Sequence, residues 1–152
     1  MRVRARVPRW RLIPVACLAA AGGCQTYVIQ GTVVQGRFGE MAFVRPDDPR
    51  LDDPAIINVR VTVDRDPDSL ARRQVGTRIT DAKGRFEIPV GEFGAGWMDE
   101  QWLLRAFKNG YQTVSTTQRL PRGSDRRLLI IMTSGQSGAA REDLQEQYER
   151  FR

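Results

Sequence analysis

The chain has 152 residues, with 24 Lys and Arg, 18 Asp and Glu and no histidine, so its formal net charge is +6. This length suits one domain of ordinary size, and the lack of histidine excludes catalytic triads and zinc or haem sites that depend on an imidazole. Hydrophobic residues make up 41% of the chain and charged residues 28%, which is typical neither of a disordered chain nor of a polytopic membrane protein.

Residues 1–23 are predicted to be a secretory signal peptide. A basic segment with five arginines comes first, and a ten-residue apolar stretch, interrupted only by Pro14, follows from Leu12 to Ala21. A membrane-spanning helix needs about 20 apolar residues, so this stretch is too short to span a bilayer. A basic segment, a short apolar segment and small residues, in that order, are typical of a signal peptide.

The junction Ala21-Gly22-Gly23-Cys24 resembles the lipobox of bacterial lipoproteins, although that family normally has Leu where this chain has Ala21. The resemblance implies a diacylglyceryl thioether on Cys24, cleavage before it and acylation of the new N-terminus. The protein would then be exported and held in the cell envelope by membrane lipid. Gln25 follows the cysteine, which in this family favours the outer membrane of a cell with two membranes. Ordinary cleavage after Ala21 or Gly23, with Cys24 left as a free thiol, is the alternative.

Cleavage before Cys24 changes both the charge and the cysteine count. The removed segment contains five of the 24 basic residues and none of the 18 acidic ones, which leaves 19 basic against 18 acidic residues, about +1. It also removes Cys17, so the mature chain has one cysteine and cannot form an internal disulfide. A nearly neutral chain is not expected to bind nucleic acid.

Seven β-strands are predicted in the rest of the chain, with turn residues between them. This number is typical of an immunoglobulin-like β-sandwich. The alternation from Ile57 onwards places Ile57, Val59, Val61 and Val63 on one face. The predicted strands are Tyr27–Val34, Ile57–Val63, Thr77–Thr80, Arg85–Val90, Trp102–Lys108, Gln112–Leu120 and Leu128–Met132.

Four segments carry more specific predictions. The run Asp81 to Gly84 is predicted to be a hairpin turn in which Gly84 has a positive φ, and Phe86 then enters the core. The polar, Thr-rich segment 112–120 is expected at a sheet edge, and the apolar segment 128–132 is expected to be buried on both faces. Residues 135–152 are expected to form a short helical tail, with Ser137 as its N-cap.

The run Thr80 to Val90, TDAKGRFEIPV, resembles the signature of carboxypeptidase-regulatory-like domains, which have a transthyretin-like (prealbumin-like) β-sandwich. The family's other elements fall on Gly31-Thr32-Val33, on the strand Val59 to Val63 and on Gly110-Tyr111. The resemblance implies a sandwich over residues 24–134. It also implies an accessory module for stability, spacing or adhesion, without catalytic residues and without a cofactor.

Two acidic groups are candidates for cation binding, because Ca²⁺ takes six to eight oxygen ligands. Asp64, Asp66 and Asp68 alternate after the second predicted strand, but Ser69 replaces the glycine of an EF-hand and Val75 stands where its bidentate Glu belongs. Neighbouring arginines offer the alternative of simple charge neutralisation. The other group is the loop that contains Asp47, Asp48, Asp52 and Asp53.

Trp97 and Trp102 are the candidate ligand-binding residues, since exposed aromatic rings beside carboxylates can stack on sugars. They bracket Asp99 and Glu100, the residues that a hydrolase would need as a carboxylate pair. Three functions therefore stand: a non-catalytic lipid-anchored structural or interaction module with a protein partner, a polysaccharide- or peptidoglycan-binding lipoprotein, and a small hydrolase. A cluster of arginines, Arg119, Arg122, Arg126 and Arg127, offers contact with an anionic surface.

Overall fold

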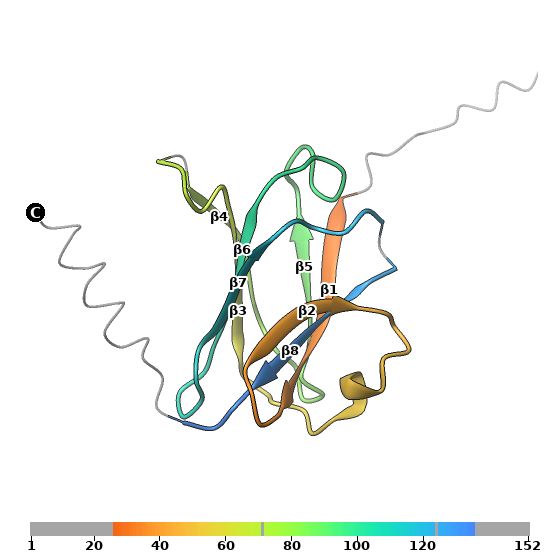
Figure 1. Cartoon of the computed structure of the whole chain (residues 1–152), viewed down its shortest axis with the longest axis vertical. Helices are drawn as coiled ribbons and strands as arrows, with labels where there is room; N and C mark the ends of the chain where they lie inside the picture. Colours follow the sequence, from red (N-terminus) through yellow and green to blue (C-terminus); the bar gives the residue numbers. More distant parts are fainter. Residues whose placement is uncertain (1–25, 71, 124, 136–152) are drawn as a thin grey trace, which may run out of the picture.

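The computed structural model describes residues 26–70, 72–123 and 125–135. They form two four-stranded β-sheets packed face to face (Figure 1). One sheet has the order β2-β8-β1-β5 and the other the order β4-β3-β6-β7. The elements are β1 Tyr27–Gln35, β2 Glu40–Val44, the 3₁₀ turn η1 Pro49–Asp52, β3 Arg60–Arg65, β4 Arg73–Ile79, β5 Arg85–Val90, β6 Trp102–Phe107, β7 Val114–Gln118 and β8 Arg127–Met132. The prediction of an all-β sandwich is confirmed.

The sandwich has eight strands, so the predicted number of seven was wrong. The additional strand, β2, lies between the predicted strands Tyr27–Val34 and Ile57–Val63, and it pairs antiparallel with β8. Its five residues, EMAFV, are mostly apolar without alternation. Strand β2 therefore lacks the period of two from which a half-buried strand is predicted.

The main core lies between the sheets and is built by alternating residues of both. Phe86 of β5 points inward, as predicted, and so do Ile88 and Val90, while the residues between them are exposed. Burial of a side chain such as isoleucine or valine contributes about 1.5–3 kcal/mol each, so this layer supplies most of the driving force for folding. Val61 and Val63 of β3 face it from the other sheet.

Strand β8 is buried on both faces, as its uninterrupted apolar sequence predicts. Leu128, Ile130 and Met132 point into the main core. Leu129 points to the outer side, where it packs in a second cluster with Val34 and Val44 that Leu51 of η1 covers. The segment between β2 and β3 therefore covers part of the outer face of the first sheet.

The predicted inward position of Ile57 was wrong. Asn58 has a φ of +56°, in the left-handed region, and this interrupts the extended backbone before β3 begins at Arg60. The alternation of side chains is lost at that point, so Ile57 is exposed while Val59 and Val61 are fully buried.

The turn Asp81 to Gly84 was wrongly predicted to join two paired strands. Strand β4 pairs with β3 and β5 pairs with β1, so this turn carries the chain from one sheet to the other. Its local geometry is as predicted, since Gly84 has a φ of +68° and Phe86 is buried. The edge position of β7 is also confirmed, because β7 ends its sheet. The signal peptide, Cys24 and the predicted C-terminal helix lie outside the described residues.

Candidate functional site

The end of the sandwich at which β1 begins carries the candidate site (Figure 1). Tyr27 is the first residue of β1, and its hydroxyl donates a hydrogen bond to the carbonyl of Pro121 at 3.0 Å. Burial, together with the nearby carboxylate of Asp125, raises the pKa of Tyr27 to about 12. The connection between β7 and β8 is thereby held against the start of β1.

The loop 91–101, between β5 and β6, lies beside this start and presents aromatic side chains to solvent. Phe93 is 77% exposed and Trp97 is 59% exposed, and their rings meet edge to face with centroids 5.4 Å apart. Gly94 and Gly96 have positive φ values, and the tight turn they permit places both rings on the outside of the loop. Thr26 and Tyr27 line, together with residues of this loop, a cleft of about 380 Å³.

One arginine holds both ends of this loop. Arg65, the last residue of β3, contacts Glu92 at 3.1 Å and Glu100 at 2.5 Å, and its guanidinium lies 6.0 Å from the ring centroid of Trp102. Arg73 of β4 also pairs with Glu92. Charge-assisted bonds of this kind are stronger than neutral ones, so the loop is attached to the second sheet at both of its ends.

The two tryptophans predicted to form one binding surface are separated. Trp102 is the first residue of β6 and is 1% exposed, so it is a core residue and cannot stack on a ligand. Strand β6 directs it inward because alternate residues of a strand face opposite sides. Phe93, which the sequence analysis did not single out, takes its place beside Trp97. The sequence offered no periodic signal for Phe93, since it lies outside any strand.

Two of the acidic residues considered for cation binding, Asp64 and Asp48, form ion pairs with arginines. Asp64 pairs with Arg72 at 2.7 Å, and Asp48 pairs with Arg50 at 2.9 Å. The hydrogen bonds from Arg50 lower the pKa of Asp48. Within the described ranges, no group of three or more acidic, cysteine or histidine side chains is arranged to hold a metal ion. For Asp64 and Asp48 the neighbouring cation is thus an arginine of the same chain.

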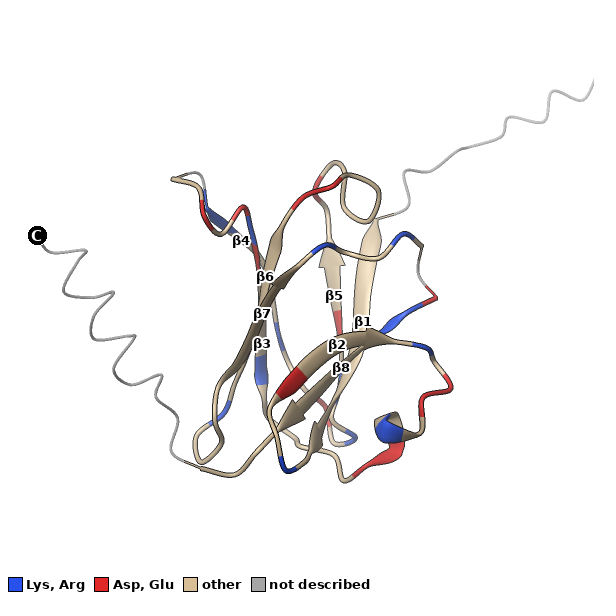
Figure 2. Cartoon of the chain, viewed as in Figure 1, with Lys and Arg blue, Asp and Glu red and all other residues tan. Residues whose placement is uncertain are grey.

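The proposed hydrolytic pair is also divided between two partners. Glu100 points to Arg65, whereas Asp99 forms an exposed ion pair with Arg119 at 3.1 Å. The arginine cluster is divided in the same way, because Arg127 donates to Gln30 on the outer face of β1. Arg122 and Arg126 are exposed. Both basic and acidic residues occur along the loops at this end (Figure 2).

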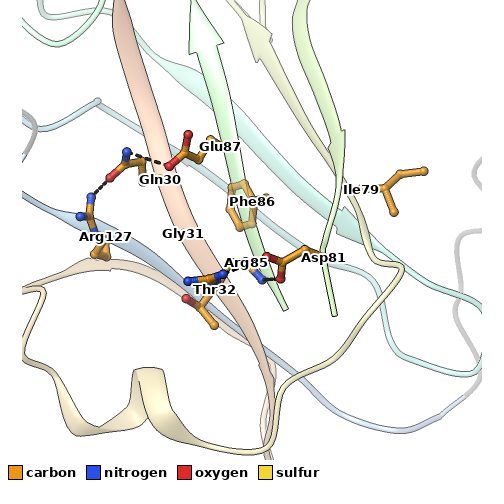
Figure 3. Close-up of a pocket in the computed structure, with 9 residues that line it drawn as sticks. All are labelled: Gln30, Gly31, Thr32, Ile79, Asp81, Arg85, Phe86, Glu87 and Arg127. Carbon is orange, nitrogen blue, oxygen red and sulfur yellow. Dashed lines mark hydrogen bonds and ion pairs between the residues drawn. The ribbon is translucent and has the colours of Figure 1, made fainter. Parts of the chain in front are cut away.

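A second cleft, of about 500 Å³, lies at the edge of the first sheet near the Asp81 turn (Figure 3). Its polar side chains bond mainly to one another. Gln30 accepts a hydrogen bond from Arg127 and donates one to Glu87 at 3.0 Å. Asp81 accepts the backbone N–H groups of Lys83 and Arg85, which lowers its pKa. These groups already satisfy one another, and the cleft presents no reactive constellation.

No protein-family model matches the chain, and no curated protein or solved structure matches it either. In the part of the chain that the structure describes, no helix has the length and apolar character needed to cross a membrane.

Proposed function

We propose that this protein is a non-catalytic lipoprotein of the bacterial cell envelope, anchored through acylated Cys24, whose β-sandwich is a structural or interaction module. The observation that carries the proposal is the spacing between the lipobox-like cysteine and the fold. Strand β1 begins at Tyr27, three residues after Cys24. The sandwich would thus follow its anchor directly, without a long linker.

The non-catalytic role is supported by the charged side chains at the candidate site. Glu92 and Glu100 both pair with Arg65, and Asp99 pairs with Arg119. A general acid or base needs a perturbed, accessible group within reach of a substrate, and paired carboxylates of this kind serve to hold a loop. The whole chain also has no histidine.

We further propose that the sandwich is of the prealbumin-like kind found in carboxypeptidase-regulatory-like domains. The segment that carries the resemblance, Thr80 to Val90, forms the turn between the sheets and strand β5. Thr80 is buried and attaches this corner to the segment before β3, since its hydroxyl accepts the N–H of Val59 and donates to the carbonyl of Ile56. A motif that builds a corner of the fold is consistent with a scaffold role.

The anchor is tested with the two cysteines of the chain as a matched pair. Cys24→Ser is expected to abolish incorporation of labelled fatty acid and to release the protein from the membrane fraction, because the acylated sulfur is lost. Cys17→Ser, within the predicted signal peptide, is expected to leave both unchanged. A mature N-terminus whose mass shows an unmodified Cys24, or a different first residue, contradicts the proposal.

A polysaccharide- or peptidoglycan-binding lipoprotein is the second candidate, and the exposed ring of Trp97 favours it. The sugar-binding surface would consist of Trp97 and Phe93, because Trp102 is in the core. Affinity electrophoresis in polysaccharide and cell-wall gels tests it. Retardation that Trp97→Ala removes, and that Phe38→Ala on a different loop preserves, would support it. Unretarded migration in every gel would eliminate it.

A further inference from the structure

The exposed aromatic loop lies where the chain would leave the membrane, if the proposed anchor at Cys24 is correct. Only Gln25 and Thr26 stand between Cys24 and Tyr27. The Cα atoms of Cys24 and Tyr27 are therefore at most about 11 Å apart, even when the chain is fully extended. The start of β1 therefore cannot lie far from the lipid headgroups. The same argument applies to whatever is packed against Tyr27.

The loop 91–101 is packed against Tyr27. A Cβ atom added to Gly96 would lie 2.4 Å from the Tyr27 ring, so the loop backbone and this ring are in direct contact. Thr26 and Tyr27 also line the same cleft as Phe93 and Trp97. In Figure 1 the loop, in green, stands beside the upper end of β1. The loop 91–101, like Tyr27, therefore cannot lie far from the lipid headgroups.

The chemistry of the loop suits the boundary between headgroups and acyl chains. From Phe93 to Met98 the sequence is FGAGWM, without a charged residue. Glu92, Asp99 and Glu100 flank it, and each of them pairs with an arginine, which reduces the repulsion between these carboxylates and an anionic bilayer. Tryptophan and other aromatic rings prefer this interfacial zone, where one end of the ring is apolar and the other is wet.

Two exposed arginines lie in the connection between β7 and β8, which Tyr27 contacts. Arg122 follows Pro121, whose carbonyl accepts the hydrogen bond from Tyr27, and Arg126 follows Asp125, which acts on the Tyr27 pKa. Basic side chains close to a membrane surface are attracted to anionic lipid headgroups, by about 1 kcal/mol each. Asp125 partly offsets this attraction, so the apolar loop is the main contact.

We propose that the loop 91–101 is a membrane-contact element, in which Phe93, Trp97 and Met98 enter the interfacial layer of the bilayer that holds the Cys24 anchor. The edge-to-face arrangement of Phe93 and Trp97, with an interplanar angle of 86°, offers no shared flat platform for stacking on a sugar ring. A lipid interface needs no such platform. The sandwich would then be held in one orientation at the membrane, with the β1–β2 turn pointing away.

The test uses the full mature chain, residues 24–152, produced without the signal peptide. Its single cysteine is coupled to maleimide-bearing lipid in vesicles of phosphatidylethanolamine and phosphatidylglycerol that contain brominated phospholipid. The mature chain has two tryptophans, Trp97 and the buried Trp102. On coupling we expect the emission to shift to shorter wavelength and to be quenched by bromine. Trp97→Phe, which leaves only Trp102, should lose the shift and most of the quenching.

Phe93→Ser and Phe38→Ser provide a matched comparison, because the two phenylalanines are 77% and 79% exposed and Phe38 lies in the β1–β2 turn at the opposite end of the sandwich. Phe93→Ser should weaken the quenching of Trp97, whereas Phe38→Ser should not. Equal effects of the two variants would contradict the proposal. So would an unshifted, unquenched Trp97 in coupled protein that circular dichroism shows to be folded.

Other occupants of the loop give distinct results. A blue shift of the emission that depends on protein concentration and needs no vesicles indicates contact with a second copy of the chain. A blue shift produced by soluble peptidoglycan fragments indicates sugar binding. Either result overturns the lipid contact. Chemical coupling supplies the anchor whether or not the cell acylates Cys24. An unmodified Cys24 in cells therefore contradicts the proposed function, while failure in the coupled protein contradicts only this inference.

Discussion

At the scale of single residues, Gly84 is the clearest case of a position that accepts one amino acid. It has a φ of +68°, and a Cβ atom there would lie 2.6 Å from the carbonyl oxygen of Val33. The backbone N–H of Val33 donates to the carbonyl of Gly84 at 2.8 Å, so β1 and the turn lie too close together for a side chain. Conformation and space both require glycine.

These two requirements are separated by comparing Gly84→Ala with Gly110→Ala. Gly110 has a φ of +83° but nothing lies within 4 Å of an added Cβ. We expect Gly110→Ala to lower the free energy of unfolding by about 1–2 kcal/mol, the cost of left-handed backbone alone. Gly84→Ala should cost more, because it adds a steric clash with backbone. Urea unfolding measures both, and equal losses would mean that the turn can move away from β1.

The hydrogen bonds that Asp81 accepts predict how the free energy of unfolding depends on pH. Bonds from the backbone N–H groups of Arg85 and Lys83 lower its pKa below the ordinary value of 3.8, since they favour the ionised form in the folded state. This stabilisation is present above pH 3.8 and is lost as the pH falls below that value through the folded-state pKa.

Asp81→Asn should therefore make the free energy of unfolding fall less steeply with acidification than in the wild type. Denaturant titrations at a series of pH values below neutrality measure the slope. Asp47→Asn, in another loop, is the control. If both variants follow the wild-type slope, the Asp81 bonds do not contribute to acid stability.

At the scale of elements, Arg65 shows how a loop without secondary structure is positioned. It reaches both ends of the loop 91–101, through Glu92 and Glu100, and its side chain is only 25% exposed. Removal of this arginine takes the cation from Glu100 and leaves Glu92 paired with Arg73. A hydrogen bond to a charged group contributes about 1.5–3 kcal/mol, reduced where solvent screens it.

We expect Arg65→Ala to lower the free energy of unfolding by about 1–2 kcal/mol and to speed hydrogen exchange in the loop 91–101. Arg73→Ala should have a smaller effect, because Arg73 is largely exposed and contacts Glu92 alone of these two carboxylates. Exchange mass spectrometry resolves the loop peptides. A loop that exchanges no faster in Arg65→Ala than in Arg73→Ala would rule out this role for Arg65.

Strands with a regular pattern were predicted well. Arg85–Val90 alternates buried and exposed residues and has the predicted bounds, and the uninterrupted apolar run of β8 indicated burial on both faces correctly. Strand β2 was missed because its short apolar sequence has no period of two. Ile57 was misplaced because a single residue, Asn58, adopts a left-handed conformation that alternation cannot reveal.

At the scale of the whole molecule, the formal net charge of +6 comes mainly from arginines concentrated at the N-terminus. Five basic residues precede Leu12, and the remaining chain has 19 basic against 18 acidic residues. Among the described residues, both basic and acidic residues occur along the loops (Figure 2), and several of them pair with one another. The near-balance of charge in residues 24–152 predicts that they present no broad surface of one sign.

A protein produced as residues 24–152 should accordingly elute from heparin at or below physiological salt and leave duplex DNA unshifted in a gel. A fusion of residues 1–23 to a neutral carrier protein should be retained, because its five arginines are concentrated in one segment. Salt-dependent retention of the mature chain itself would show that the near-neutral total conceals a basic surface.

The sequence by itself determined the all-β class, the inward faces of the regular strands and the candidate anchor at Cys24, because periodicity and segment order are local properties. Only the tertiary structure decided that the Asp81 turn joins two sheets, that β2 completes the first sheet and that Trp102 is buried while Trp97 is exposed. Strand pairing and side-chain exposure depend on contacts between residues far apart in the chain. The aromatic loop lies beside the start of β1 for the same reason, since Arg65 and Tyr27 hold it there from two different sheets.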